Sequence, residues 1–321
     1  MTNDRFRKFC IVGVGGHART KLIPAIRANG QRLAAVVSSQ PATNFPDAAV
    51  FPRLEEAIAK LPRDTTFLIA TPPALHFEQT KLVLQNGFDL LLEKPAFVTR
   101  QEAEQVVLIC ERQPVVLVEA FMHRYTRLYS ELLAVWATSR DRVRGIEITF
   151  LIPMMPAGTF RSETQITSSG LFDIGCYPIS LLADIGLGEA DLAVSQVHFA
   201  GNPDKMRIGI TGSAGEVAIA IDIGVGDTYA NCVCLHLDDG EAICFAPFFY
   251  GRKADRSIST SRGGDTQART FPDEDAFEVM LARPRDAWRR DQAGRSAQMI
   301  DVAGRLEELA REVLSASAGG P

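Results

Sequence analysis

Residues 9–18, Phe-Cys-Ile-Val-Gly-Val-Gly-Gly-His-Ala, join a run of four apolar residues directly to a glycine-rich turn. The apolar run predicts a buried strand, and the segment after the turn predicts a helix. In this context the spacing G-x-G-x-x-A is typical of a dinucleotide-binding turn. Gly13 permits the tight turn, Gly15 lets a pyrophosphate approach the backbone, and Ala18 allows close packing of helix on strand. The alternative is an ordinary strand-to-helix turn that favours small residues.

The first part of the chain continues to alternate apolar runs with amphipathic segments. Five runs read as strands, and the pattern predicts an α/β fold with a Rossmann-type, doubly wound parallel sheet. From about residue 191 to 247 the alternation has a period of two, and Asp-Asp-Gly at 238–240 predicts a hairpin turn. We therefore expect a dinucleotide-binding domain at 1–121 and a second domain at 122–321, built on a large, mostly antiparallel open sheet. We expect the polar residues 251–272 to form a loop.

The strands expected in the second domain are rich in Val, Ile and Ala. The helices visible in the sequence are too few to cover both faces of such a sheet, so one apolar face is expected to stay uncovered. Because an uncovered apolar face is normally a partner surface, we expect a homodimer through this sheet.

The composition of the chain argues against several classes of protein, among them nucleic-acid-binding and membrane proteins. The chain has 321 residues, of which 46% are hydrophobic, and a formal net charge of −5. Without a basic stripe there is no electrostatic basis for binding nucleic acid or an anionic membrane. No signal peptide is evident, and no apolar stretch approaches the roughly 18 residues that a membrane span needs. We expect a cytoplasmic protein that acts on a small-molecule substrate.

Six cysteines lie mostly within apolar segments. None forms a Cys-x-x-Cys pair, and no His/Cys cluster has the spacing of a zinc site. We therefore expect reduced, buried thiols and no bound metal.

The end of the second expected strand bears on the choice of cofactor. A carboxylate about 20 residues beyond the glycine-rich turn usually binds the ribose 2′-hydroxyl of NAD and repels a 2′-phosphate. Here residues 36–40 read Val-Val-Ser-Ser-Gln, without an acid. This favours NADP, with Ser38 and Ser39 as donors to the phosphate and NAD as the alternative. No Lys or Arg follows these serines before Arg53. The phosphate therefore needs a cation from elsewhere, and Arg19 can approach it from the helix start.

Two more loops follow buried strands. Thr-Pro-Pro-Ala-Leu-His at 71–76 is held extended by its prolines beside the expected cofactor path. Glu-Lys-Pro at 93–95 follows a leucine-rich strand, and open α/β sheets build active sites at the carboxyl ends of their strands. The alternatives are that His76 packs at a helix start and that Glu-Lys-Pro is an exposed turn. The residues expected to contact the cofactor are Gly13, Gly15, Gly16, His17, Ala18, Arg19, Ser38, Ser39, Thr71, Pro72, His76, Glu93 and Lys94.

A third group of polar residues lies in Gly-Leu-Phe-Asp-Ile-Gly-Cys-Tyr-Pro at 170–178. Asp173 and Tyr177 are four residues apart, so they share one face at a helix start. A tyrosine can donate a proton to a carbonyl oxygen, and a nearby lysine such as Lys94 would stabilise its phenolate. We expect Lys94, Tyr177 and Asp173 to be catalytic. The alternative is that Asp173 caps a helix and Tyr177 packs in a core.

Arg124 follows the last expected parallel strand, in Glu-Ala-Phe-Met-His-Arg-Tyr at 119–125. It would either meet an anionic or hydroxylated substrate or pin the junction between the domains. We expect His123 at the surface or at that junction. The substrate-binding candidates are Lys94, Arg124, Arg161, Asp173 and Tyr177.

These motifs, in this order, resemble the Gfo/Idh/MocA family of oxidoreductases from about residue 8 to about 185. The resemblance implies an N-terminal Rossmann domain, a C-terminal α/β domain whose open sheet carries a dimer contact, and a last helix (about 287–314) that packs near the first domain. It makes Lys94 the active-site lysine and Asp173 the substrate-site aspartate. Tyr177 resembles the branch with dimeric dihydrodiol dehydrogenase, NADP-dependent xylose dehydrogenase and several ketosugar reductases.

The motifs and the resemblance together predict an NAD(P)-dependent dehydrogenase or reductase. It would transfer a hydride between nicotinamide and a secondary alcohol or ketone of a sugar, polyol or cyclic diol. One alternative is an imine reductase acting on a natural-product intermediate, and another is a non-catalytic, dinucleotide-sensing regulator. The presence of Lys94, Asp173 and Tyr177 together argues against the regulator, which needs only the glycine-rich turn.

Overall fold

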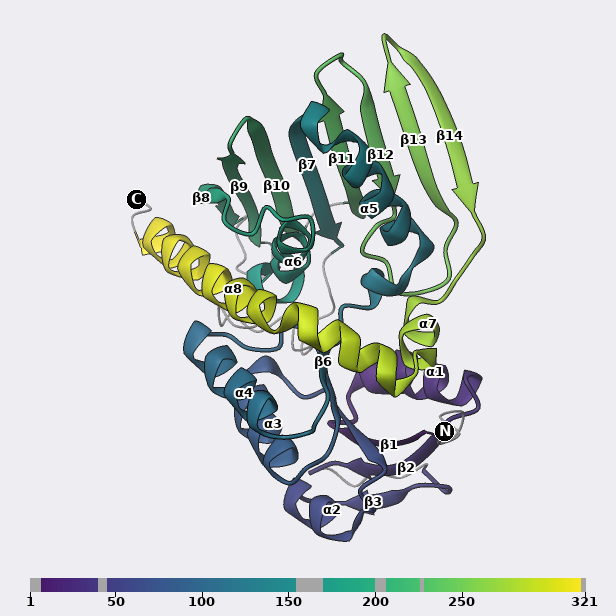
Figure 1. Cartoon of the computed structure of the whole chain (residues 1–321). Helices are drawn as coiled ribbons and strands as arrows, with labels where there is room; N and C mark the ends of the chain where they lie inside the picture. The colour runs from purple at the N-terminus through teal and green to yellow at the C-terminus, as the bar shows by residue number, and fades with distance from the viewer. Residues whose placement is uncertain (1–6, 40–44, 154–169, 200–205, 226–227, 319–321) are drawn as a thin grey trace. The chain divides into compact units, whose positions relative to one another are not determined.

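The computed structural model forms two compact units, shown in Figure 1. The N-terminal unit comprises residues 1–121 and 277–303, and the C-terminal unit comprises residues 122–276 and 304–321. The described helices include none with the length and apolarity that crossing a bilayer requires. The structure describes residues 7–39, 45–153, 170–199, 206–225 and 228–318.

The N-terminal unit is built on a six-stranded sheet in the order β3-β2-β1-β4-β5-β6, and every neighbouring pair is parallel. This confirms the predicted doubly wound sheet. The short strand β3, with two exposed residues out of three, was not among the five expected strands. The strands are β1 (Lys8–Val12), β2 (Arg32–Val37), β3 (Ala49–Phe51), β4 (Thr65–Ile69), β5 (Leu90–Leu92) and β6 (Leu117–Glu119).

Helices flank this sheet, with α3 and α4 together on one side and α1 on the other in Figure 1. Met299 and Ala303 of the long helix α8 join the apolar core of this unit, and the part of α8 after residue 303 belongs to the C-terminal unit. The helices of the unit are η2 (Ala18–Leu22), α1 (Ile23–Ala28), α2 (Leu54–Lys60), η3 (Pro73–Leu75), α3 (His76–Gln85), α4 (Arg100–Arg112), most of α7 (Ala276–Ala282) and the first part of α8 (Arg285–Ala318).

The C-terminal unit contains an eight-stranded sheet in the order β14-β13-β12-β11-β7-β10-β9-β8. Only β7 and β10 pair in parallel, which confirms a mostly antiparallel sheet. Helices α5 (Arg127–Ser139) and α6 (Cys176–Asp184) lie on the same face of it (Figure 1). The strands are β7 (Val143–Ile152), β8 (Asp191–Phe199), β9 (Met206–Ala214), β10 (Val217–Val225), β11 (Ala230–Leu237), β12 (Ala242–Ala246), β13 (Arg256–Arg262) and β14 (Asp265–Phe271).

The expected loop at 251–272 is wrong, because most of it forms the hairpin β13–β14. The signal was Gly263-Gly264, whose φ angles of +60° and +96° suit a two-residue hairpin turn. The flanking Ser and Thr residues obscured the pattern, since β14 is an edge strand with one buried residue at its end.

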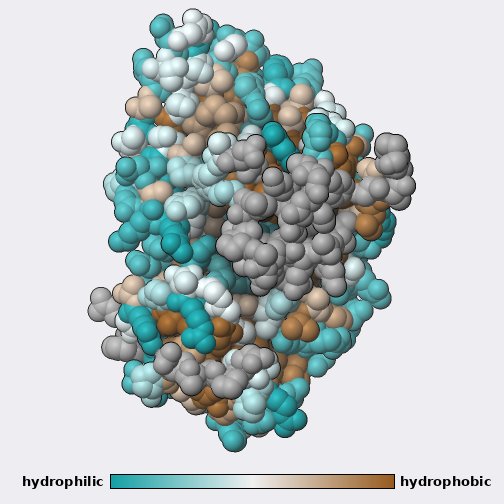
Figure 2. Space-filling view, turned by 180° about the vertical axis from the view of Figure 1, so that it is seen from behind, coloured by the Kyte–Doolittle hydropathy of each residue, from teal (hydrophilic) through white to brown (hydrophobic). Residues whose placement is uncertain are grey.

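The two faces of the eight-stranded sheet differ in side-chain size. On the face that carries α5 and α6, the central strands bury large aliphatic residues: Ile146, Ile148, Ile219, Ile221, Val233 and Leu235. On the opposite face Ala193, Thr211 and Ala220 lie side by side and exposed. This exposed face therefore mixes small residues with charged ones such as Glu147, Arg207 and Asp222, and it is not the broad apolar surface that the Val, Ile and Ala content suggested. In Figure 2, seen from behind, the upper part mixes pale, teal and brown residues.

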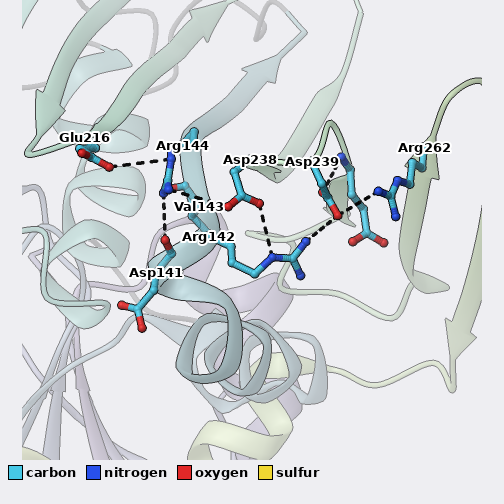
Figure 3. A network of polar contacts seen from close by, with 9 residues as sticks. Asp141, Arg142, Val143, Arg144, Glu216, Asp238, Asp239 and Arg262 are labelled. Atoms are coloured by element: carbon cyan, nitrogen blue, oxygen red, sulfur yellow. Dashed lines mark hydrogen bonds and ion pairs between the residues drawn. The ribbon is translucent and has the colours of Figure 1, made fainter.

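Exposed charges tie the β11–β12 turn to the segment before β7 (Figure 3). Arg142 Nη2 lies 2.6 Å from Asp239 Oδ2, and Arg262 Nη2 lies 3.3 Å from the same oxygen. The Asp238 amide donates to the Arg142 carbonyl at 2.9 Å. Hydrogen bonding from the Glu241 amide, followed by the two guanidinium groups, holds the pKa of Asp239 below its usual range. These contacts reinforce the register of the hairpin, although each exposed pair contributes little to stability.

Cys234 and Cys244 form a disulfide across this hairpin, which corrects the expectation of reduced thiols throughout. The two residues are directly opposite each other on β11 and β12, with Cα atoms 4.1 Å apart. The close Cα distance is that of an antiparallel pair without mutual hydrogen bonds, in which side chains approach most closely. Cys10, Cys110, Cys176 and Cys232 are free.

Thiol titration tests this pairing. Unreduced, denatured protein should show four reactive thiols, and six should appear after reduction. Cys234→Ser should lower the free energy of unfolding by up to about 3 kcal/mol, because the bridge closes a short loop in the unfolded chain. Six thiols in freshly purified, unreduced protein would contradict the disulfide.

Candidate active site

The glycine-rich turn between β1 and η2 has the geometry that its sequence predicts. Gly13 has φ +88°, and a Cβ atom there would lie 2.8 Å from Thr71 Cγ2. A Cβ on Gly15 or Gly16 would meet nothing within 4 Å. Gly13 is therefore required by the fold, whereas Gly15 and Gly16 leave open space above the turn. Ala18 is buried where the helix begins. These residues fit the diphosphate of a nicotinamide dinucleotide, bound by the amides of the turn and the helix start.

Arg19 lies beside this turn and close to the end of β2. Its Nε donates to the Val14 carbonyl at 3.1 Å, and its guanidinium stacks over the Phe45 ring at 5.0 Å. Ser38 and Ser39 follow β2, whose last residue pairs with the last residue of β1. The structure thus places Ser38 and Ser39 at the strand end next to the turn that carries Arg19.

Glu93 and Lys94 follow β5 at the carboxyl edge of the sheet. The buried Glu93 carboxylate contacts His17 Nε2 at 2.9 Å and accepts the Lys94 amide at 3.3 Å. Burial raises the pKa of Glu93, but His17, Lys94 and His76 outweigh it and hold the pKa below the usual range. Glu93 is therefore ionised, and Lys94 is half-buried beside a negative charge. His17, expected as a cofactor contact, also has its ring edge against Phe277.

Glu119, at the end of β6, also holds this loop. Its Oε1 accepts the Ala96 amide at 2.8 Å, and the side chain is buried. The sequence showed only a polar residue at a strand end. The pairing of β5 with β6 explains its contact with Ala96, which follows β5.

His76 is completely buried, so the structure gives it other partners than the cofactor. Its Nε2 lies 2.9 Å from the Thr71 carbonyl, and its Nδ1 lies 2.9 Å from the Pro95 carbonyl. Burial lowers the pKa of His76 against the opposing effect of these carbonyls and of Glu93, so the ring is neutral near pH 7. The Thr71 hydroxyl donates to Gln79 at 2.7 Å, and Pro72 is exposed.

Tyr177 lies in α6 of the C-terminal unit, in a group of aromatic rings. Its hydroxyl contacts Met122 Sδ at 3.4 Å, and its ring centroid is 5.4 Å from those of His123, Phe150 and Phe249. Of the two positions expected for His123, the surface one is wrong, because His123 is fully buried beside Tyr177. The sequence did not indicate Phe150 and Phe249, since they come from β7 and from the segment after β12.

Asp173 lies one helical turn before Tyr177, in η8 (Leu171–Gly175), and is half-buried. Gly175 explains how the two helical segments reach the sheet. A Cβ at Gly175 would lie 2.7 Å from Ile223 Cδ1 of β10 and 3.2 Å from Leu171 Cδ1. The motif Asp-Ile-Gly-Cys-Tyr therefore sets the side chains of Asp173 and Tyr177 on a helix that packs tightly against β10.

Arg124 pairs with Asp184 inside the C-terminal unit. Its Nε and Nη2 donate to the two carboxylate oxygens at 2.8 and 3.1 Å, and the Tyr129 hydroxyl donates to the same carboxylate at 2.8 Å. The side chains of Arg124 and Asp184 are only 6% and 3% exposed. Of the two roles that the sequence left open, the structure gives Arg124 an internal, structural one. Arg161 lies outside the described residues.

Comparison with known proteins gives the family. A family profile described as an oxidoreductase family with an NAD-binding Rossmann fold matches residues 7–121. Residues 7–121 therefore match the NAD-binding domain of the Gfo/Idh/MocA family. The match covers the unit that holds the glycine-rich turn and the parallel sheet, and it describes that unit as an NAD-binding Rossmann fold.

The curated relatives are distant. The D-xylose 1-dehydrogenase (NADP(+)) 2 of Haloferax volcanii is 27% identical over 57% of this chain and 58% of its own length. The dTDP-3,4-didehydro-2,6-dideoxy-alpha-D-glucose 3-reductase of Streptomyces antibioticus is 28% identical over 56% of each chain. The chain thus matches little more than half the length of these relatives.

Solved structures share the whole fold. The 3-ketoreductase of Actinomadura kijaniata in complex with NADP and TDP-benzene has a TM-score of 0.80 at 18% identity, covering 96% of this chain and 98% of that one. An aldose-aldose oxidoreductase of Caulobacter crescentus has a TM-score of 0.78 at 16% identity, with 97% and 98% covered. At such identities the likeness establishes the fold alone.

Gly15 offers a direct test of the cofactor site. Gly15→Asp should weaken NADP(H) binding at least about ten-fold, because it puts a negative charge where the diphosphate is expected. Gly15→Ala should weaken it less, since it adds size without charge. Both variants should keep the parent unfolding temperature, because a Cβ at Gly15 meets no atom. Fluorescence titration with NADPH measures the affinity, and parent-like binding by Gly15→Asp would refute the site.

Proposed function

We propose that this oxidoreductase transfers a hydride between a nicotinamide dinucleotide and a secondary alcohol or ketone of a sugar, polyol or cyclic diol. The observation that carries the proposal is Lys94. It is a half-buried ammonium group at the carboxyl end of β5, in a sheet whose first turn is open to a dinucleotide. A cation in that position suits an oxygen that gains negative charge as a carbonyl is reduced.

Three side chains carry the proposed chemistry besides the cofactor, which supplies or accepts the hydride when bound. In the reducing direction, Tyr177 donates its hydroxyl proton to the carbonyl oxygen as the carbon gains the hydride. Lys94 binds the same oxygen and stabilises the tyrosinate that remains. Asp173 accepts a hydrogen bond from a neighbouring substrate hydroxyl and so orients the ring. Proton transfer by a positioned side chain contributes about 10²–10⁴-fold to the rate.

A hydroxylated carbon ring or chain is the substrate class that we favour. The relatives are named for D-xylose, a dTDP-ketosugar, trans-1,2-dihydrobenzene-1,2-diol and scyllo-inositol. All four compounds present a secondary hydroxyl or a ketone beside another oxygen. This shared chemistry suits Asp173 as an acceptor next to the reacting group.

NADP is the cofactor that we favour over NAD. Ser38 and Ser39 stand where an acid would repel a 2′-phosphate, and Arg19 offers a guanidinium at the neighbouring turn. Phe45 keeps that guanidinium stacked beside the turn. The relatives from Haloferax volcanii and Bacillus subtilis are also named for NADP(+).

A substrate panel tests the proposed activity. D-xylose, scyllo-inositol and trans-1,2-dihydrobenzene-1,2-diol should be incubated with NADP+ and, separately, with NAD+. Absorbance at 340 nm then measures formation of the reduced cofactor. We expect turnover with at least one compound and higher kcat/KM with NADP+. Absence of turnover on polyols together with reduction of cyclic imines by NADPH would favour an imine reductase instead.

Substitution of the two proposed reacting side chains tests the mechanism. Lys94→Ala and Tyr177→Phe should each lower kcat by at least about 10²-fold while NADP(H) affinity stays near that of the parent. Lys81→Ala, on a half-buried lysine of α3 that pairs with Glu78, is the matched control and should leave kcat unchanged. Full kcat in Tyr177→Phe would mean that the tyrosine only packs, because Phe fills the same space.

We also propose that two copies associate through the small-residue face of the eight-stranded sheet. Small side chains let two sheets approach closely, and Ala193, Thr211 and Ala220 form an exposed row across three strands. Light scattering at micromolar concentration should give the mass of two chains. Ala220→Arg should convert the dimer to monomer, whereas Ala59→Arg on the exposed side of α2 should not. A monomeric parent protein would overturn this proposal.

A further inference from the structure

His76 bridges two loops at the carboxyl edge of the parallel sheet. Its Nε2 faces the Thr71 carbonyl at 2.9 Å, while its Nδ1 faces the carbonyls of Pro95 and Ala96 at 2.9 and 3.3 Å. Thr71 follows β4, and Pro95 and Ala96 follow its neighbour β5. The ring is completely buried, and its two nitrogen atoms contact one loop each.

The sheet itself cannot hold these carbonyls. The pairing of β4 with β5 ends at Ile69 and Leu92, and the last bond across it runs from the Glu93 amide to the Ile69 carbonyl. Pro95 and Ala96 lie beyond that point. A buried backbone group without a partner costs about 1–3 kcal/mol, so a donor from outside the sheet is needed here. His76 is that donor.

We propose that His76 is a positioning residue for Lys94, an inference that rests on the catalytic role proposed for Lys94. A neutral ring carries a single N–H, and Nδ1 faces two carbonyl oxygens where Nε2 faces one, so we place the proton on Nδ1. Nε2 then lies against the Thr71 carbonyl without donating to it. That proton holds the backbone immediately after Lys94. The Ala96 amide donates to Glu119, so the Pro95–Ala96 peptide is held at both its carbonyl and its amide.

The other charged groups near His76 lie on the same loops. Glu93 is the nearby carboxylate, and its own partners are His17 and Lys94. Loss of the His76 contact would therefore release the Pro95 end of the loop while the Glu93 end stayed held. Lys94 would keep its charge, but the backbone next to it would no longer be fixed. A misplaced catalytic group lowers kcat more than it changes ground-state binding.

Two isosteric substitutions separate the two contacts. Asn places its amide nitrogen near the position of Nδ1, and Gln places its amide nitrogen near that of Nε2. His76→Asn should therefore keep the contact with the Lys94 loop, and His76→Gln should keep only the contact with Thr71. With D-xylose and NADP+, or the panel compound turned over fastest, His76→Asn should stay within about three-fold of the parent kcat. His76→Gln should lose at least about ten-fold.

Hydrogen–deuterium exchange of residues 94–98 gives a readout that needs no substrate. Exchange there should be at least ten-fold faster in His76→Gln than in the parent, and parent-like in His76→Asn. Both variants should keep the parent NADPH affinity. Equal exchange and equal kcat in the two variants, whether both are impaired or both unimpaired, would overturn the proposal, as would a greater defect in His76→Asn.

The double variant links the effect to Lys94. If His76 acts through Lys94, His76→Gln should cost nothing further in a Lys94→Ala background, because the two effects are not additive along one path. A full additional ten-fold loss would overturn the positioning role. Parent-like kcat in Lys94→Ala alone would instead refute the proposed function of the lysine, so the two failures are distinguishable.

Discussion

The hydrogen bonds that hold Glu93-Lys94-Pro95-Ala96 are the constraint on which the candidate site depends. This loop begins where β5 ends, and buried backbone groups beyond a strand still need partners. His17, His76 and Glu119 supply contacts to the loop from the ends of β1, β4 and β6. All strands of the sheet are parallel, so their carboxyl ends meet at one edge. That is why residues so far apart in the sequence converge on a single loop.

Charge balance at this loop follows from burial. A carboxylate as buried as Glu93 is stable only when ionic and hydrogen-bonding partners compensate for lost solvation. His17 and Lys94 provide that compensation, and the low pKa of Glu93 is its consequence. The glycine-rich turn and the lysine loop are thus coupled through His17, although they lie about 80 residues apart in the sequence.

Local chemistry explains what the sequence could predict. The G-x-G-x-x-A spacing defines a turn within one strand–helix unit, so the φ of Gly13 and the open space at Gly15 were predictable from it. Partners set by tertiary register were not. His76 acquires its carbonyls only when β4 and β5 become neighbours, and Arg124 meets Asp184 across 60 residues. The sequence therefore offered these two as possible ligands, and packing gave them structural partners.

The disulfide and the β13–β14 hairpin differ from the sequence-based expectations, although the sequence contains a signal for each. Cys234 and Cys244 lie symmetrically about the turn at Asp239, so the predicted hairpin already placed them opposite each other. The absence of Cys-x-x-Cys and of zinc spacing favoured reduced thiols, but the hairpin register brings these two cysteines together. Likewise, Gly263-Gly264 marked a hairpin within residues that looked like a loop. In both cases turn geometry was the stronger evidence, because it constrains which residues pair, whereas composition constrains only their average environment.

The period-two pattern of the second domain carries more information than fold class. Strand β10 alternates large aliphatic residues with small ones, as in Ala218-Ile219-Ala220-Ile221, whereas β7 and β11 also place Glu147 and His236 at outward positions. The large residues form the core beneath α5 and α6, where burial stabilises the unit. The opposite face is only weakly apolar, because its small residues lie among the pairs Arg207–Asp222 and His236–Glu147. Such a face does not depend on a large hydrophobic area to exclude water, so association through it would rest on close fit. Close fit is sensitive to a single bulky side chain, and this sensitivity makes the face specific for a matching surface such as its own copy.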